Sequence, residues 1–457
     1  MKNLVIFLML VFLGYIFAAG TCGTAGKTGT TPFTANSLSY ADVDACVNTH
    51  AAAGETVILP SGSASWSSTL TITDSIIIYG ATEGCPSACD DGTKITSNGS
   101  AVLIHVSTAG DKSIDISKLT LDGNGAGQVV WMSNSEQANP LYSLRIHHNE
   151  FENATAYAVE WKDGIHMIYG LVDNNKFTNN NYDAKFWGPD VAYPWTTWPG
   201  VDYIGSKEYI YFEDNISTGA GDFILTSGHS SRWVYRYNTV DLASNADKAF
   251  DVHGDNLNYG VVAAEIYENT FTNASSIWLV DINGGTGIFF NNAISGSTGP
   301  INWEEEYFGS ECEPSARPES LRINNSYAWN NTNDSGIVGA AEVDSGDCLA
   351  EGTNFWDDNQ QLTGGGVYID EDNNGTVTKD VASNRNPSSC TEDDVYWETD
   401  TDTNGDGYPG VLYRCVTTNN WSKVYEAYTY PHPLRNEAVE VPVNAIQGVV
   451  LNGAELK

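Results

Sequence analysis

The sequence predicts an all-β fold in which short parallel strands wind into a single-stranded solenoid, a parallel β-helix. One phrase, an apolar or aromatic segment that runs into an asparagine, recurs between residues 149 and 325. Successive asparagines of this phrase are 26, 40, 23, 31, 23 and 33 residues apart. A short step with loops inserted between repeats is typical of a solenoid. The asparagines are Asn149, Asn175, Asn215, Asn238, Asn269, Asn292 and Asn325.

The segments before these asparagines favour strands over helices. They are rich in β-branched and aromatic residues, and Thr, Asn, Gly or Ser follows them instead of helix-period apolar residues. Stacked coils would place the asparagine of one repeat about 4.8 Å from the next. We therefore expect the asparagines to take a left-handed turn conformation and to form an internal hydrogen-bond ladder, with ligand binding as the lesser alternative.

The N-terminal region predicts an export signal, a cap and the first coils. Residues 1–20 combine Lys2, an apolar run and small residues at 18–20, as signal peptides do. Residues 40–48 have helical spacing and predict a short helix that covers the open end of the solenoid. Short strands are expected at 55–60, 66–72 and 75–80.

This order of elements resembles the entry of pectin-lyase-like parallel β-helices. In that family a helix precedes a Thr-Val-x-Leu-Pro-x-Gly strand, here 56–62, and an Ile-x-Ile-x-Gly strand, here 76–80. The resemblance covers residues 36–330 and implies a right-handed solenoid of about ten coils with an irregular C-terminal region. The string Tyr-Pro-His-Pro-Leu at 430–434, with residues 231–238, resembles a group of secreted bacterial and environmental β-helix proteins.

The chain divides into four parts on composition. These are the signal peptide (1–20), the β-helix with its cap (21–335), an acidic decorated region (336–435) and a C-terminal strand tail (436–457). Eight cysteines in an exported chain predict disulfides, paired within an N-terminal and a C-terminal group. The first group is Cys22, Cys46, Cys85 and Cys89, and the second is Cys312, Cys348, Cys390 and Cys415.

The charge balance limits the possible partners. The chain has 58 acidic and 21 basic residues, a net charge of −37. Such a field repels nucleic acid and anionic membranes, so neither is expected as a partner. It also repels anionic glycans unless cations bridge them. A cation-bridged ligand, a neutral ligand and adaptation to a salty habitat all remain open, as does the oligomeric state.

Candidate catalytic residues lie on the outward face of the strands. Side chains two apart share a face, so the residue two before each asparagine points outward if the residue three before is buried. The resemblance implies that an exposed sheet holds the sugar chain and that Arg or Lys often serves as the base of β-elimination. We take Arg236 as the first candidate base, with a surface ion-pair ladder as the stronger alternative. Arg232 and Arg145 are further basic candidates, and His147, His229 and His253 are alternative proton carriers.

Hydrolysis would instead need two carboxylates across the scissile bond. Asp173 with Glu213, or Asp251 with Asp255, could supply them. The motif set that marks polygalacturonase-like hydrolases is absent as a group, so elimination is the favoured reaction.

Substrate contacts are expected from the outward file and from an aromatic insertion. Glu213, Tyr211 and Tyr267 belong to the outward positions. Flat indole faces suit pyranose rings, although the insertion's tryptophans could equally form a small core of their own. The candidate tryptophans are Trp187, Trp195 and Trp198.

Two acidic segments resemble the first half of EF-hand-type calcium loops. Oxygen-bearing side chains alternate and a glycine stands at the sixth position, but the closing glutamate is replaced by Val411 and Val381. Plain acidic turns are the alternative. The candidate ligands are Asp400, Asp402, Asn404 and Asp406 in one loop and Asp370, Asp372 and Asn374 in the other.

The sequence therefore predicts a secreted protein that binds a polysaccharide and cleaves it, by lyase-type elimination in preference to hydrolysis, with Ca²⁺ as a structural and possible catalytic cofactor. A non-catalytic extracellular module that binds glycan or spaces other parts is the alternative from another class.

Overall fold

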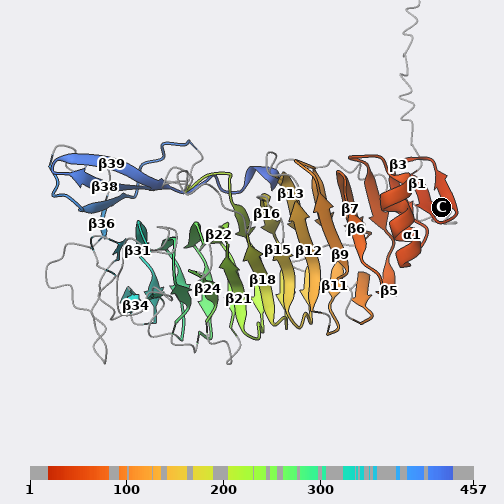
Figure 1. Ribbon diagram of the computed structural model, residues 1–457, viewed down its shortest axis with the longest axis horizontal. Coiled ribbons are helices and arrows are strands. Elements are labelled where there is room, and N and C mark those ends of the chain that lie inside the picture. The colour runs from red at the N-terminus through yellow and green to blue at the C-terminus, as the bar shows by residue number, and fades with distance from the viewer. Residues whose placement is uncertain are drawn as a thin grey trace, which may run out of the picture.

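The computed structural model confirms a β-solenoid built from parallel sheets. It describes residues 19–81, 92–99, 102–125, 127–134, 141–161, 168–188, 204–229, 231–242, 248–254, 261–274, 278–296, 301–304, 323–334, 336–337, 340–343, 349, 352, 354–357, 377–380, 389–405 and 410–435. Successive coils stack along one axis from the cap to the C-terminal strands (Figure 1).

Each complete coil contributes one strand to each of three sheets, which we name A, B and C. Neighbouring coils pair in parallel, apart from short antiparallel pairs at the two ends. Sheet A contains, in spatial order, β2 (Gly26–Thr28), β1 (Ala19–Gly23), β3 (Thr30–Ala35), β4 (Thr56–Leu59), β7 (Ile76–Gly80), β10 (Ile114–Ser117), β13 (Leu141–His147), β16 (Ile168–Asp173), β19 (Ile210–Glu213), β22 (Arg232–Arg236), β25 (Ala263–Tyr267), β28 (Thr286–Phe290), β31 (Ser326–Trp329) and β35 (Phe355–Trp356).

Sheets B and C complete the coils. Sheet B contains β33 (Gly336–Ile337), β32 (Thr332–Asn333), β29 (Ala293–Ile294), β26 (Thr270–Thr272), β23 (Thr239–Asp241), β20 (Ile216–Thr218), β17 (Lys176–Thr178), β14 (Glu150–Glu152), β11 (Thr120–Asp122), β8 (Thr93–Ser97) and β5 (Gly62–Trp66). Sheet C contains β34 (Ala340–Val343), β30 (Ile301–Trp303), β27 (Val280–Ile282), β24 (Phe250–Val252), β21 (Phe223–Gly228), β18 (Tyr182–Trp187), β15 (Tyr157–Trp161), β12 (Gln128–Asn134), β9 (Ile104–Thr108) and β6 (Leu70–Ile72).

The predicted asparagine ladder forms at the turn between sheets A and B. The side-chain oxygen of each asparagine accepts the backbone and side-chain N–H groups of the preceding one, over 2.8 to 3.2 Å. Every member is buried, so each hydrogen bond satisfies a group that water cannot reach. The members are Asn149, Asn175, Asn215, Asn238, Asn269, Asn292 and Asn331.

Two details of the ladder differ from the prediction. The left-handed conformation belongs to the residue before each asparagine, for example Tyr237 with φ 57° and Glu268 with φ 57°. The backbone changes direction at this residue, so the following asparagine side chain points inward. The seventh member is Asn331 instead of Asn325. Strand β31 starts only at Ser326, so Asn325 lies ahead of the strand and takes a positive φ of 49°.

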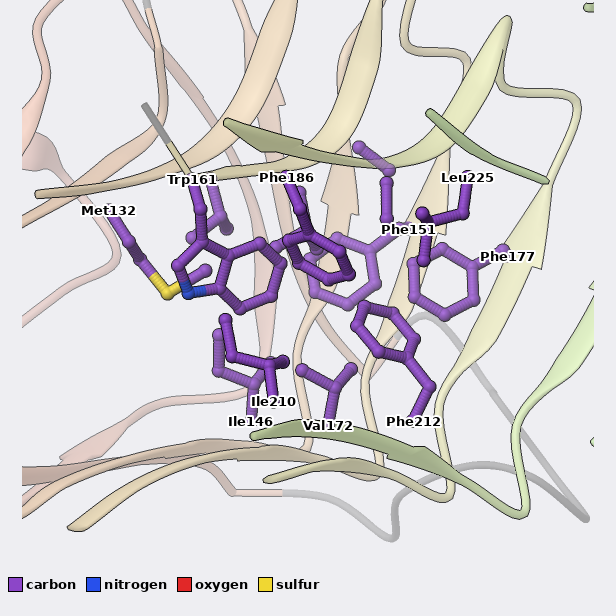
Figure 2. Packing of buried hydrophobic residues seen from close by; sticks show 14 of the residues in the cluster. Met132, Ile146, Phe151, Trp161, Val172, Phe177, Phe186, Ile210, Phe212 and Leu225 are labelled. Atoms are coloured by element: carbon purple, nitrogen blue, oxygen red, sulfur yellow. The ribbon is translucent and has the colours of Figure 1, made fainter. Parts of the chain in front are cut away.

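The core runs through the interior of the coils as one apolar column. Figure 2 shows side chains from opposing sheets pointing toward one another, with Trp161 and Phe186 from sheet C facing Val172 and Phe212 from sheet A. The residues predicted to face inward, three before each ladder asparagine, all belong to this core: Ile146, Val172, Phe212, Tyr235, Ile266 and Phe289.

A helical cap closes the N-terminal end, as predicted. Helix α1 (Tyr40–Asp44) continues into the π-helical turn η1 (Ala45–His50), and Ser39 caps α1 by accepting the Asp42 N–H. The indole of Trp66 donates to the Leu38 carbonyl over 2.8 Å. The disulfide Cys22–Cys46 joins β1 to this cap, within the N-terminal cysteine group.

The C-terminal region folds into a small sheet of β36 (Val377–Asp380), β37 (Val395–Glu398), β38 (Val411–Thr417) and β39 (Asn420–Glu426). The disulfide Cys390–Cys415 holds it, as predicted for the second cysteine group. The other four cysteines, Cys85, Cys89, Cys312 and Cys348, lie outside the described residues. In the described part of the chain no helix is long and apolar enough to cross a membrane.

After β39 the chain returns along sheet A as residues 427–435, which we call the strap. It ends in the short 3-10 helix η6 (Pro433–Arg435) and lies against β16, β19 and β22 (Figure 1). Beneath the strap and the small sheet, outward residues of sheet A form a second apolar cluster that includes Tyr211, Tyr267 and Phe290.

Replacing Asn238 by alanine tests the ladder. Asn238→Ala removes the acceptor of the Asn215 N–H and should lower the free energy of unfolding by about 1–3 kcal/mol, because a buried donor loses its partner. Urea denaturation provides the measurement. The exposed Asn48→Ala is the matched control, and an equal loss in both variants would contradict a special role for the ladder.

Candidate functional site

The outward file of sheet A does not form the exposed platform that the sequence predicts. Its side chains point away from the core as expected, but Asp173, Glu213, Arg236 and Tyr267 have 0% of their surface exposed. The strap and the small C-terminal sheet cover them. The prediction of an open glycan-binding face on this sheet is therefore wrong, because a segment about 200 residues later in the chain occupies it.

Arg236 is enclosed by acceptors. Its five N–H groups donate to Glu213 twice, to the Tyr267 hydroxyl at 2.7 Å, and to the backbone carbonyls of Tyr428 and Thr429. Burial alone would lower its pKa, but Tyr267 and Glu213 raise the pKa above its ordinary value. A guanidinium that keeps its proton and has every donor engaged supports the ion-pair alternative and gives no support to a role as catalytic base.

The other basic candidates near sheet A are also engaged. Arg145 makes two 2.9 Å contacts with the buried Asp173 carboxylate. Arg232 lies 3.4 Å from Glu208. His147 contacts Asp115 at 3.0 Å and His148 at 2.7 Å, with 14% of its side chain exposed. These groups border the strap and are not gathered into one accessible site.

Sheet C carries a second outward file, which runs from the cap toward the C-terminus in continuous register. Asp251 on β24 pairs with Asp281 on β27, and the next partner is Asn302 on β30. Toward the N-terminus the file continues through Thr226, Lys185, Glu160, Trp131, His105 and Thr71.

The three longest loops between successive asparagines of the repeat, within 175–215, 238–269 and 292–325, all follow strands of this sheet. Phe186-Trp187 ends β18, Asp251 lies within β24 with His253 directly after it, and Trp303-Glu304 ends β30. These strands lie in the order β18, β21, β24, β27, β30. Segments separated by more than 100 residues in the chain therefore lie within five neighbouring strands of sheet C. Loops held by a rigid sheet are a common location for functional sites.

Asp251 and His253 form a dyad on this face. The His253 imidazole lies 2.7 Å from Asp251 Oδ2, and the Thr226 hydroxyl donates to the same oxygen at 3.3 Å. The side chain of Asp251 is 9% exposed and that of His253 is 29% exposed. Of the two, His253 is therefore the group that solvent reaches.

Asp281 lies beside the dyad on the next coil and is held by cationic and amide donors. Lys248 forms an ion pair with Asp281 Oδ2, and the Asn302 amide donates to Oδ1 over 2.8 Å. Burial alone would lower the pKa of Lys248, but Asp281, Asp251 and Glu304 raise it overall. Asp281 and Lys248 were not predicted from the sequence. The signal for Asp281 was available in matching apolar-polar-apolar triplets at 250–252, 280–282 and 301–303.

Trp187 borders the site, but the aromatic ladders of sheet C do not present open ring faces. Trp187 packs 4.1 Å from the His229 ring, and the Lys185 ammonium lies 4.7 Å from its indole. The Tyr182 ring stacks on Phe223 at 5.4 Å, and the Lys185 ammonium lies 4.6 Å from the Tyr157 ring, so neighbouring coils cover these rings. Among these described aromatic residues, Trp187 is therefore the one at which stacking on a sugar is expected. Trp195, Trp198 and Asp255 lie outside the described residues.

The described part of the first candidate calcium loop is closed by protein contacts. Asp402 Oδ1 accepts the Gly405 N–H over 2.6 Å, and the Asn404 side chain donates to the Ala427 carbonyl over 3.0 Å. Glu426 accepts the Thr403 N–H over 2.6 Å and also binds Lys423. Across the described residues no three His, Cys, Asp or Glu side chains gather as a metal site. Asp400, Asp402 and Asn404 are only the described part of the predicted ligand set, so calcium binding stays a prediction. Asp406, Asp370, Asp372 and Asn374 lie outside the described residues.

Comparison with known proteins adds no family to this geometry. No family model matches the chain, and no curated protein is significantly similar to it.

Replacing Arg236 by methionine tests its structural role. Arg236→Met leaves the buried Glu213 short of its main partner and should lower the free energy of unfolding by about 3–5 kcal/mol. Lys94→Met, which breaks a partly exposed pair with Glu152, should cost about 1 kcal/mol or less. Chemical denaturation of both variants provides the comparison. Undiminished stability together with lost glycan cleavage would restore Arg236 as a catalytic candidate.

Thermal unfolding with and without a chelator tests the predicted calcium. A metal that binds only the folded chain raises the melting temperature, so EDTA should lower it and added Ca²⁺ should restore it. An unchanged melting temperature at saturating Ca²⁺ would mean that both loops are plain acidic turns.

Proposed function

We propose that this protein is a secreted enzyme that binds a polysaccharide on the outer face of sheet C and cleaves it there. The observation that carries the proposal is the in-register pair Asp251 and Asp281, at the end of the sheet from which the long insertions emerge. We also assign the solenoid to the right-handed pectin-lyase-like architecture. The three-sheet coils and the order of the N-terminal elements support this assignment.

The spacing of the carboxylates suits hydrolysis of a glycosidic bond. Adjacent strands lie about 4.8 Å apart. Carboxylates about 5–5.5 Å apart are typical of retaining glycosidases, which use one as nucleophile and the other as acid and then base. The Lys248 ammonium and the Asn302 amide stabilise negative charge on Asp281. Asp281 is therefore suited to be the nucleophile that attacks the anomeric carbon. Asp251 suits the proton donor to the leaving oxygen, because His253 can resupply the proton.

This chemistry differs from the elimination that the sequence favoured. Elimination needs a base beside the uronate and a cation on its carboxylate. The candidate base Arg236 is enclosed beneath the strap, whereas sheet C places two carboxylates in register beside the partly exposed His253 and Lys248. The geometry therefore favours hydrolysis, and the identity of the product distinguishes the two reactions.

The charges around the pair also favour a neutral or amino-sugar glycan over a polyuronate. Three acidic groups, Asp251, Asp281 and Glu304, act on the Lys248 ammonium, so negative charge outweighs positive charge around the pair. The net charge of −37 adds a repulsive field for any polyanion.

A glycan panel with two variants tests the proposal. Asp251→Asn and Asp281→Asn should each slow the release of reducing ends by about 100-fold or more while glycan binding is retained. Asp241→Asn, an exposed carboxylate on sheet B, is the matched control and should leave the rate unchanged.

The product decides between the reactions. Saturated reducing ends support hydrolysis, whereas the ultraviolet absorbance of an unsaturated uronate would indicate elimination. Binding without any product would favour the non-catalytic glycan-binding module. No binding to any glycan by the folded protein would refute the proposal.

A further inference from the structure

The interface between the strap and sheet A is unusually rich in buried charge. The sheet contributes Asp173, Glu213 and Arg236, each with 0% of its surface exposed. The strap contributes Arg435, which lies 3.4 Å from Asp173 and 2.9 Å from Glu213. A cover that only protected apolar surface would be more stable with apolar side chains, because burying charges is expensive. The charges instead make the closed state sensitive to protonation.

Hydrogen bonds, ion pairs and ring contacts hold the strap on sheet A, and they would break together on its release. Arg236 donates to two strap carbonyls, and the His432 N–H donates to Glu213 over 3.2 Å. Tyr430 stacks on Tyr237 with ring centroids 3.7 Å apart. None of these contacts is covalent, and none involves a backbone hydrogen bond of the coils. The solenoid can therefore remain wound when the strap leaves.

His432 lies within this charged interface as a neutral group. Burial and the nearby Arg236 together lower its pKa from 6.5 to about 3, against the opposing effect of Asp173. Its Nδ1 accepts the N–H of Leu434 over 3.2 Å, which also requires the unprotonated nitrogen. The groups that face it are Arg236, Arg435, Arg145, Asp173, Glu213, Tyr211 and Tyr428.

Glu265 is a second buried titratable group near this interface, and β39 covers it instead of the strap. The carboxyl accepts the Tyr425 hydroxyl at 2.8 Å and the Gly205 N–H at 2.9 Å. It therefore links β25 to β39 and to the segment that precedes β19. Burial raises its pKa from 4.5 to about 7. The groups that face it or share its surroundings are Arg236, Arg232, Tyr209, Tyr211, Tyr267, Tyr425, Glu208 and Glu213.

We propose that the strap is a releasable latch that stays closed in neutral medium and opens in acid. Its release uncovers the side chains of Arg236 and Tyr211, which strap residues contact in the closed state.

The direction of the response follows from which state binds protons. The open state takes up a proton at His432 below pH 6.5, whereas the closed state takes it up only near pH 3, so acid favours opening. Glu265 stays covered when the strap leaves, because Tyr425 of β39 and Gly205 hold it, so its protonation does not change on opening. Opening therefore becomes steadily more favourable as the pH falls from 6.5 to about 3.

Cysteine labelling of the full chain tests the latch. Ala427→Cys places a thiol on the buried side of the strap, and Ala328→Cys places one in the solenoid core; both alanines are at most 2% exposed. A pyridyl disulfide reagent, which remains reactive in acid, reports opening at each site after division by the rate for the unfolded chain. We expect labelling at Ala427→Cys to rise about 15-fold between pH 4.5 and 3, while Ala328→Cys stays protected.

Two further variants in the Ala427→Cys background assign the response. His432→Asn keeps an acceptor for the Leu434 N–H and should abolish the rise in acid. Glu265→Gln changes a buried group that the strap does not cover, so the rise in acid should be unchanged and the variant serves as the matched control. Parallel labelling of both cysteines, or labelling at Ala427→Cys that does not depend on pH, would overturn the proposal. If Glu265→Gln does not fold, the His432→Asn variant decides the question alone.

Discussion

The stacking of each coil on the next in fixed register is the constraint on which the rest of this structure depends. The buried asparagine ladder enforces it, because each side chain satisfies the N–H groups of its neighbour and cannot do so after a slip of one residue. Register turns distant sequence positions into neighbours. The ion pair of Glu213 with Arg236 and the carboxylate pair of Asp251 with Asp281 both result from it.

The outer faces of the solenoid have different chemistry because different segments cover them. The strap and the small C-terminal sheet enclose sheet A, so its polar residues act as ion-pair and hydrogen-bond partners for the chain itself. On sheet C the partly exposed side chains near the insertions are those of Lys185, Trp187 and His253. A single repeating scaffold thus has one face enclosed by its own chain and another to which we assign the proposed ligand chemistry.

Local pattern was enough to predict the parallel solenoid, the cap, the inward file from Ile146 to Phe289 and the pairing of cysteines within each end group. Each of these depends on periodicity or on residues close in sequence. The enclosure of Arg236 could not be predicted in this way, since its carbonyl acceptors lie 192 and 193 residues later. The pairing of Asp251 with Asp281 required the register of sheet C, which the asparagine period of sheet A does not reveal when loops differ in length.

The strap also changes how the molecule can bear force. A solenoid without cross-links is a linear stack whose coils can be peeled from one end independently of the others. Here Arg435 contacts carboxylates of β16 and β19, and Tyr425 reaches Glu265 on β25. Tension applied to the terminal coil would therefore be shared with coils in the middle of the stack. The chain closes a mechanical loop on itself, and its central coils gain a resistance to peeling that hydrogen bonds between neighbours alone would not provide.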